Sequence, residues 1–180
     1  MRIIAGQWRG RLLIAPKGDT TRPTADRTRE ALFSMLTSRL GSFEDLRVAD
    51  FFAGSGALGL EALSRGAASC TFVEQDKPAL DALRANVAAL KAQADIRAQS
   101  VMALAPTKEP FDLILIDPPY GTGAGQVALD RCRRLGWVAD SAIISIETAR
   151  NETIALAGFT IDAERIHGKA KVTLLRPAAQ

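Results

Sequence analysis

The sequence is poor in the residues that bind metals and form disulfides. Its 180 residues include two cysteines, Cys70 and Cys132, and one histidine, His167. Both cysteines lie in predicted core elements, so we expect them to be buried and reduced. Because His167 has no second histidine or cysteine nearby in the sequence, no metal site is predicted.

Long apolar runs and domain linkers are also absent. No run approaches the roughly 18 apolar residues of a membrane-spanning helix, and the amino terminus lacks the apolar region of a signal peptide. We therefore expect a cytoplasmic protein that does not enter membranes. With no repeat or low-complexity tract, and with 47% apolar residues, the sequence predicts one domain with a substantial core.

The net charge of +3 is unevenly distributed along the chain. Residues 1–29 hold seven basic and two acidic residues, a net charge of +5, whereas residues 30–180 hold 16 basic and 18 acidic residues, a net charge of −2. Trp8 lies beside Arg9 and close to Arg11, a combination suited to contacting phosphates and stacking on a base. A charged edge strand, with Trp8 covering a small apolar cluster, is the alternative.

Apolar strands alternate with amphipathic helices along the rest of the chain. We expect strands at 48–52, 70–73, near 96, at 113–116 and at 142–146, and helices at 27–40, from the glycine loop to about 65, at 77–91 and at 127–135. Thr24 or Asp26 is the expected cap of the first helix. Residues 159–166 and 170–175 are expected to close the fold as a hairpin.

This alternation predicts an α/β fold with a mostly parallel, doubly wound sheet and an antiparallel last strand. We expect residues 1–23 to form a basic arm or hairpin and residues 24–180 to form the catalytic core.

The tetrapeptide Asp117-Pro118-Pro119-Tyr120 follows an apolar strand, at the sheet edge where open α/β folds place their chemistry. Two prolines remove two backbone donors and leave a stiff turn with unpaired carbonyls. The Asp117 carboxylate and the Pro118 carbonyl could each accept one N–H of an amine on a nucleobase, so that its lone pair faces an electrophile. Tyr120 would stack on the base. These four residues are the predicted catalytic residues.

A glycine loop precedes this turn in the sequence. Gly54, Gly56 and Gly59 match the dinucleotide fingerprint, and Glu74 lies twenty residues after Gly54, so a nicotinamide cofactor is one candidate. Asp50, four residues before the first glycine, favours a ligand with an ammonium and a sulfonium charge, such as S-adenosylmethionine. The glycines would admit its methionine end, and Glu74 would accept hydrogen bonds from both ribose hydroxyls.

The chain closely resembles the bacterial RsmD family. The resemblance lies in the segments Arg2–Arg11, Arg22–Phe33 and Asp50–Leu63 and in the Asp117 turn. Members of that family methylate the exocyclic N2 of one guanine in 16S ribosomal RNA. The resemblance implies a Rossmann-like class I S-adenosylmethionine-dependent methyltransferase with a seven-stranded sheet. It also implies 16S ribosomal RNA as the partner, within a small-subunit ribonucleoprotein, and no obligatory protein partner.

The motifs and the resemblance together predict which residues contact the cofactor and the RNA. The expected cofactor contacts are Asp50, Ala53, Gly54, Ser55, Gly56, Glu74, Gln75, Ser100, Val101 and Thr24. The expected RNA contacts are Trp8, Arg9, Arg11, Arg22 and Arg27. Where such enzymes commonly offer Asp or Asn to the adenine, this chain has Gln99-Ser100-Val101.

Other functions remain open at this stage. The same turn chemistry serves DNA adenine-N6 and protein glutamine methyltransferases, the glycine fingerprint allows a nicotinamide oxidoreductase, and a non-catalytic ribosome-assembly protein is a further alternative. Asp50 could simply cap the glycine loop, Glu74 could be an ordinary acidic strand end, and Glu61 could be structural, while Glu147 has no assigned role. The expected mechanism relies on positioning and on a flipped base, without a strong general base.

Overall fold

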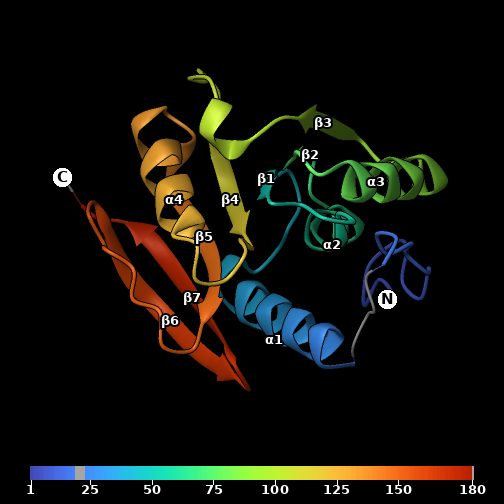
Figure 1. The fold of residues 1–180 in the computed structure, drawn as a ribbon, viewed down its shortest axis with the longest axis horizontal. Coiled ribbons are helices and arrows are strands. Elements are labelled where there is room, and N and C mark those ends of the chain that lie inside the picture. The colour runs from blue at the N-terminus through green and yellow to red at the C-terminus, as the bar shows by residue number, and fades with distance from the viewer. Residues whose placement is uncertain (19–22, 180) are drawn as a thin grey trace.

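The computed structural model describes residues 1–18 and 23–179, without the side chains of residues 23 and 24, and in this part of the chain seven strands form one mixed sheet (Figure 1). The strands are β1 (Arg47–Phe51), β2 (Ser69–Glu74), β3 (Ala94–Ala98), β4 (Phe111–Ile116), β5 (Val138–Ala149), β6 (Phe159–His167) and β7 (Ala170–Pro177). The helices are α1 (Pro23–Leu40), α2 (Ala57–Ser64), α3 (Lys77–Leu90) and α4 (Ala124–Arg134), with a 3-10 turn η1 (Val101–Ala103).

The strand order is β3-β2-β1-β4-β5-β7-β6. Strands β1 to β5 are parallel, and β7 runs antiparallel to both β5 and β6. This confirms the predicted mostly parallel sheet with an antiparallel last strand. The chain builds outward from β1 to β3 and then crosses back to place β4 on the other side of β1. The order therefore reverses between β1 and β4, and ligands of such sheets bind at the carboxyl ends beside this reversal.

The two faces of the sheet carry separate apolar cores. Helices α1, α2 and α3 cover one core, while α4 and η1 cover the other (Figure 1). Val48 and Ala49 are consecutive in β1 yet belong to opposite cores, as do Leu113 and Ile114 in β4. Successive side chains of a strand point to opposite faces, so each buried strand reads as a continuous apolar run.

Several element boundaries differ from the sequence-based expectation. Helix α1 begins at Pro23 rather than residue 27, because the fixed φ of proline suits the first helical position. Asp26 therefore lies in the first turn and is not the cap. Strand β5 extends beyond the expected residues 142–146 at both ends, because Val138 pairs with β4 and Ala149 pairs with β7.

Both cysteines are buried free thiols, as predicted. Burial raises the pKa of Cys70 well above its usual range and that of Cys132 to about 12. Among the described helices, none is long and apolar enough to cross a membrane. Within the same residues, no group of three or more His, Cys, Asp or Glu side chains is placed to hold a metal ion.

Candidate active site

Three acidic residues, Asp50, Asp117 and Glu147, meet at the carboxyl edge of the sheet. Asp50 lies on β1, Asp117 directly follows β4, and Glu147 lies near the end of β5. All three face the side covered by α1 to α3, because each lies an even number of residues after a member of that core: Val48, Leu115 and Ile143. The three carboxyl groups line one pocket.

The glycines of the loop after β1 have different roles. Gly54 has a φ of 57°, and a Cβ added there would meet nothing within 4 Å, so this glycine leaves open space beside the pocket. A Cβ on Gly56 would lie 2.5 Å from a methyl group of Leu83, and one on Gly59 would lie 2.4 Å from the ring of Phe72. Gly56 and Gly59 therefore allow α2 to pack closely on α3 and β2, while only Gly54 faces open space.

The carboxylates of Asp50 and Glu74 hold this loop in place by accepting hydrogen bonds from its backbone. Asp50 is 1% exposed, and its Oδ2 accepts the Gly59 N–H at 3.0 Å, so its capping role is present in the structure. Glu74 Oε1 accepts the Gly54 N–H at 2.8 Å, and its Oε2 accepts the N–H groups of Gln75 and Asp76, each at 2.9 Å. Both acids thus fix the loop while lining the adjoining pockets.

The turn after β4 is tied to β5 through Tyr120. The Tyr120 hydroxyl donates a hydrogen bond to Glu147, while the ring remains 45% exposed. Thr122 Oγ1 donates to the Pro119 carbonyl at 2.9 Å. The ring of Tyr120 is therefore oriented by a partner on the neighbouring strand and is still accessible to a flat ligand.

Two adjoining pockets meet at Asp117. The first, of about 730 Å³, lies between the glycine loop, α1 and the β6–β7 turn, and Asp50, Tyr120 and Glu147 line it with Asp117. The second, of about 670 Å³, runs past the ends of β2 and β3, and its lining includes Glu74, Gln75, Ser100, Val101, Asp117, Pro118 and Pro119. Pockets of this size hold small organic ligands.

Phe52 separates the strand end from the glycine loop and lines both pockets. Its φ of 59° is rare for a bulky residue. Such backbone conformations cost roughly 1–3 kcal/mol and cluster at ligand sites.

The pocket disfavours negative charge. Burial raises the pKa of Asp50 to about 8; the hydrogen bond from Gly59 opposes this increase, and the charge of Glu74 adds a smaller increase. Burial, followed by the charge and hydrogen bonding of Glu147, raises the pKa of Asp117 well above its usual range. Asp117 is exposed where the two pockets meet. The site therefore favours ligands that bring positive charge or several N–H donors.

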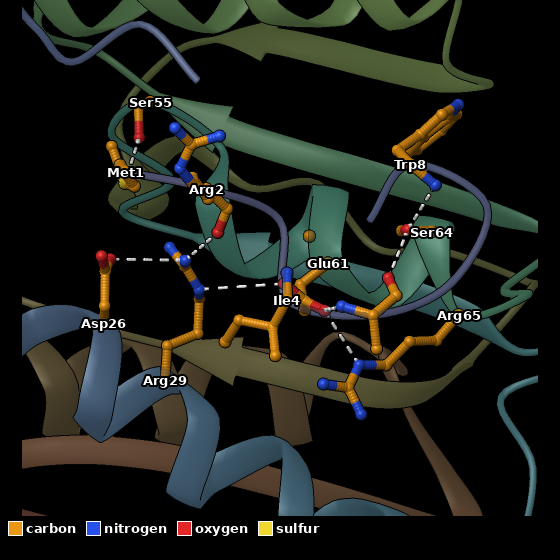
Figure 2. Close-up of polar contacts among 12 residues, drawn as sticks. Met1, Arg2, Ile4, Trp8, Asp26, Arg29, Ser55, Glu61, Ser64 and Arg65 are labelled. Atoms are coloured by element: carbon orange, nitrogen blue, oxygen red, sulfur yellow. Dashed lines mark hydrogen bonds and ion pairs between the residues drawn. The ribbon is translucent and has the colours of Figure 1, made fainter. Parts of the chain in front are cut away.

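The amino-terminal segment is docked on α2 (Figure 2). Glu61 accepts the N–H groups of Ile4 at 2.9 Å and Ala5 at 3.1 Å. The Ser64 hydroxyl accepts the Trp8 N–H at 3.0 Å and donates to the Ala5 carbonyl at 2.6 Å. The segment also forms a short hairpin, with an antiparallel bridge between residues 2 and 12 and backbone hydrogen bonds that join Ile3 to Arg11 and Gly10 and join Leu13 to Met1. The hairpin is therefore present, and α2 holds it against the core.

Glu61 lies between Arg29 of α1 and Arg65, the residue that follows α2 (Figure 2). Its side chain is fully buried, with Arg65 Nε at 3.0 Å and Arg29 Nε at 3.9 Å. Arg29 is only 5% exposed and donates to the Arg2 carbonyl, so it joins α1 to the amino-terminal segment. The charge of +5 for residues 1–29 consequently overstates what faces solvent, because Arg29 is neutralised inside the protein.

Among the predicted RNA-binding residues that the structure describes, none is part of the lining of either pocket. Arg9, Arg11 and Arg27 are exposed, although Arg11 also donates to the Ala89 carbonyl at 3.2 Å. Trp8 is half-buried and packs against the core, which matches the alternative that it covers an apolar cluster. Arg22 and the side chain of Thr24 lie outside the described residues.

Of the predicted catalytic and cofactor residues whose side chains are described, all except Gly56 line one of the two pockets, and Gly56 is buried in packing. Asp50, Ala53, Gly54 and Ser55 line the first pocket. Ser100 also accepts the Met102 N–H at 3.1 Å, so its hydroxyl caps η1.

Sequence reasoning missed several residues of the pocket wall. Met1 and Pro16 reach the first pocket because the amino-terminal segment folds back over α2 and α3, and Arg29 reaches it from α1. Met1 directly precedes one of the segments that carry the family resemblance, and Arg29 lies within another. The sequence gives no other sign of these contacts, because no local pattern predicts a contact between residues so far apart in the chain.

Comparisons with known proteins agree with this architecture. A family model described as Conserved hypothetical protein 95 matches residues 1–176. The protein "Ribosomal RNA small subunit methyltransferase D" of Escherichia coli (strain K12) is 37% identical over 184 residues, covering 100% of this chain and 91% of that protein. A solved Escherichia coli structure of a candidate methyltransferase, yhhF, superposes with a TM-score of 0.87 at 38% identity, covering 100% of this chain and 99% of that one. A magnesium protoporphyrin IX methyltransferase from Synechocystis, solved with bound SAM, shares the fold at 14% identity and a TM-score of 0.71, covering 89% and 87% of the two chains.

Proposed function

This chain belongs to the RsmD family of methyltransferases, and we propose that it methylates the exocyclic N2 of a guanine in 16S ribosomal RNA. S-adenosylmethionine is the cofactor. The observation that carries the proposal is the position of Asp117, which lines both the pocket beside the glycine loop and the pocket that ends at Glu74. A donor and an acceptor bound in the two pockets would meet beside the Asp117 turn.

The residues present fit the cofactor. When bound, S-adenosylmethionine supplies a methyl group on a positively charged sulfur. Asp50, ionised, would pair with its ammonium group, and open space at Gly54 admits its methionine end. A carboxylate offers about four acceptor positions, and three backbone N–H groups already bind Glu74. One acceptor position on Glu74 is therefore left for a ribose hydroxyl. The second ribose hydroxyl would have to share a position that a backbone N–H group already occupies.

The turn after β4 would hold the substrate amine. The Asp117 carboxylate and the Pro118 carbonyl would each accept one N–H, and Tyr120 would stack on the guanine. Held in this way, the N2 lone pair would face the methyl group that S-adenosylmethionine supplies. The proton that N2 loses after transfer would pass to solvent. Alignment supplies most of the rate, since well-oriented reactions gain roughly 7–11 kcal/mol from positioning.

RNA would approach across the exposed basic side chains near the amino terminus, including Arg9, Arg11 and Arg27. These side chains would bind phosphates, which position the RNA without reading its sequence. The guanine itself must leave its stack to reach the Asp117 turn. An assembled small subunit, which presents a preformed surface, is the substrate that suits this chain.

The test is transfer of labelled methyl from S-adenosylmethionine to small subunits and to 16S RNA from cells that lack this protein. We expect N2-methylguanosine at one position after digestion and mass spectrometry. A methylated adenine, a methylated DNA or a methylated protein as the preferred product would contradict the proposal.

Calorimetry separates the remaining alternatives. We expect binding of S-adenosylmethionine and no binding of nicotinamide dinucleotides. The opposite result would favour an oxidoreductase, and RNA binding without any cofactor binding would favour a non-catalytic assembly protein.

A further inference from the structure

We infer that Glu147 selects the base that enters the pocket, by accepting the N1–H of a guanine whose N2 amine is held at the Asp117 turn. This inference rests on the proposed function and adds a residue that reads base identity.

The position of Glu147 follows from strand register. Ile116 of β4 pairs with Ile146 of β5, so Asp117 and Glu147 are the next residues on two adjacent parallel strands. Both side chains point to the same face and line the first pocket. Adjacent strands lie about 4.8 Å apart, a spacing that lets two neighbouring acceptors contact neighbouring donors on one flat base.

The Watson–Crick edge of guanine matches two carboxylates. Guanine presents the two hydrogens of N2 and, beside them, N1–H. Adenine presents an amine beside a bare N1 that can only accept. An ionised carboxylate only accepts hydrogen bonds, so Glu147 would bind the N1–H of guanine and repel the N1 lone pair of adenine.

The two carboxyl groups lie side by side in the pocket, and the Tyr120 hydroxyl donates to Glu147. Burial and the neighbouring Glu147 raise the pKa of Asp117 well above its usual range. The three N–H hydrogens of one guanine would all be paired, N1–H with Glu147 and the two of N2 with Asp117 and the Pro118 carbonyl. An adenine would offer only two, and it would place an acceptor against an acceptor.

Glu147 also binds the Tyr120 hydroxyl, so a purely structural role in orienting that ring must be separated from base reading. A Glu147→Gln substitution makes this separation possible. The amide oxygen of glutamine can still accept from Tyr120, while its NH₂ group donates and so prefers a base whose N1 accepts.

The probe is small-subunit RNA carrying either guanine or 2-aminopurine at the mapped target, assembled by ligation. 2-Aminopurine keeps the amine on C2 but has an accepting N1. The measurement is the ratio of kcat/KM for guanine to that for 2-aminopurine. We expect the wild type to prefer guanine by about 10- to 150-fold, which corresponds to the free energy of one hydrogen bond to a charged group. Glu147→Gln should lower this ratio of kcat/KM values at least about 10-fold.

Two control variants should leave the ratio unchanged. Tyr120→Phe removes the hydroxyl that binds Glu147 and should slow both substrates equally. Glu152→Gln alters a nearby carboxylate that accepts the Gly121 N–H at 2.7 Å and is not part of either pocket's lining.

Equal wild-type rates on the two bases would overturn the inference even if Glu147→Gln failed to fold. A folded Glu147→Gln protein with the wild-type ratio would also overturn it and leave the proposed function intact. Absence of wild-type methylation of the guanine RNA would overturn the proposed function and the inference with it.

Discussion

Removing the Glu61 carboxylate tests whether the amino-terminal segment is part of the folded domain. Glu61 is fully buried and binds two backbone N–H groups and two arginine side chains. In Glu61→Ala, Arg29 keeps its charge at 5% exposure and loses its buried acidic partner. Removing one member of a buried ion pair costs about 3–5 kcal/mol. At about 2–4 °C per kcal/mol for a chain of this size, we expect the Tm to fall by about 6–20 °C.

The matched control is Glu109→Ala, because Glu109 pairs with one arginine, Arg47, at 3.4 Å but is 76% exposed. Exposed pairs contribute at most about 1 kcal/mol. Urea unfolding should therefore separate the two variants clearly. Amide exchange gives the local readout, since the N–H groups of Ile4 and Ala5 should lose protection in Glu61→Ala. Equal stability of the two variants, or unchanged exchange at Ile4 and Ala5, would refute this account of the segment.

Three further outcomes are expected. Asp117→Ala should nearly abolish methyl transfer with little change in cofactor affinity by calorimetry. Asp117→Asn should retain some activity, because its amide oxygen can still accept an N–H from the substrate amine. Full turnover by the alanine variant would exclude Asp117 from the mechanism. Because burial raises the folded-state pKa of Asp50 to about 8 from 3.8, the folded protein keeps a proton that the unfolded chain releases, so the free energy of unfolding should fall as pH rises from about 4 to about 8. Asp50→Asn should flatten that fall in urea titrations at several pH values, and an unchanged slope would argue against the shift. Replacing Arg9 and Arg11 by alanine should lower the slope of log RNA affinity against log salt by up to about 0.7–0.9 per lost phosphate contact, whereas parallel slopes would place the contact elsewhere.

The sheet was predictable because its signals are local. Each buried parallel strand is an apolar run between turn residues, so β1, β2 and β4 were placed within one or two residues from the sequence. The Asp117 turn was predictable for the same reason, since a strand end and two prolines define its place without tertiary information.

The walls of the pocket were not predictable in this way. Arg29 is a basic residue in a basic stretch, and nothing nearby in the sequence distinguishes it from Arg27, which is exposed. Its burial depends on Glu61, which lies on another helix. The pairing of Tyr120 with Glu147 likewise requires the register between β4 and β5, which periodicity alone does not determine.

The docking of the amino-terminal segment also sets an order of folding. Ile4 binds Glu61 across 57 residues, and Ile14 binds Asn86 across 72 residues. At a synthesis rate of about 5–20 residues per second, these partners leave the ribosome roughly 3–14 s after the segment does. Closing such large loops also costs entropy before any bond forms, which places this step late in folding. The part of the pocket wall that Met1 and Pro16 supply therefore assembles only after α2 and α3 have formed.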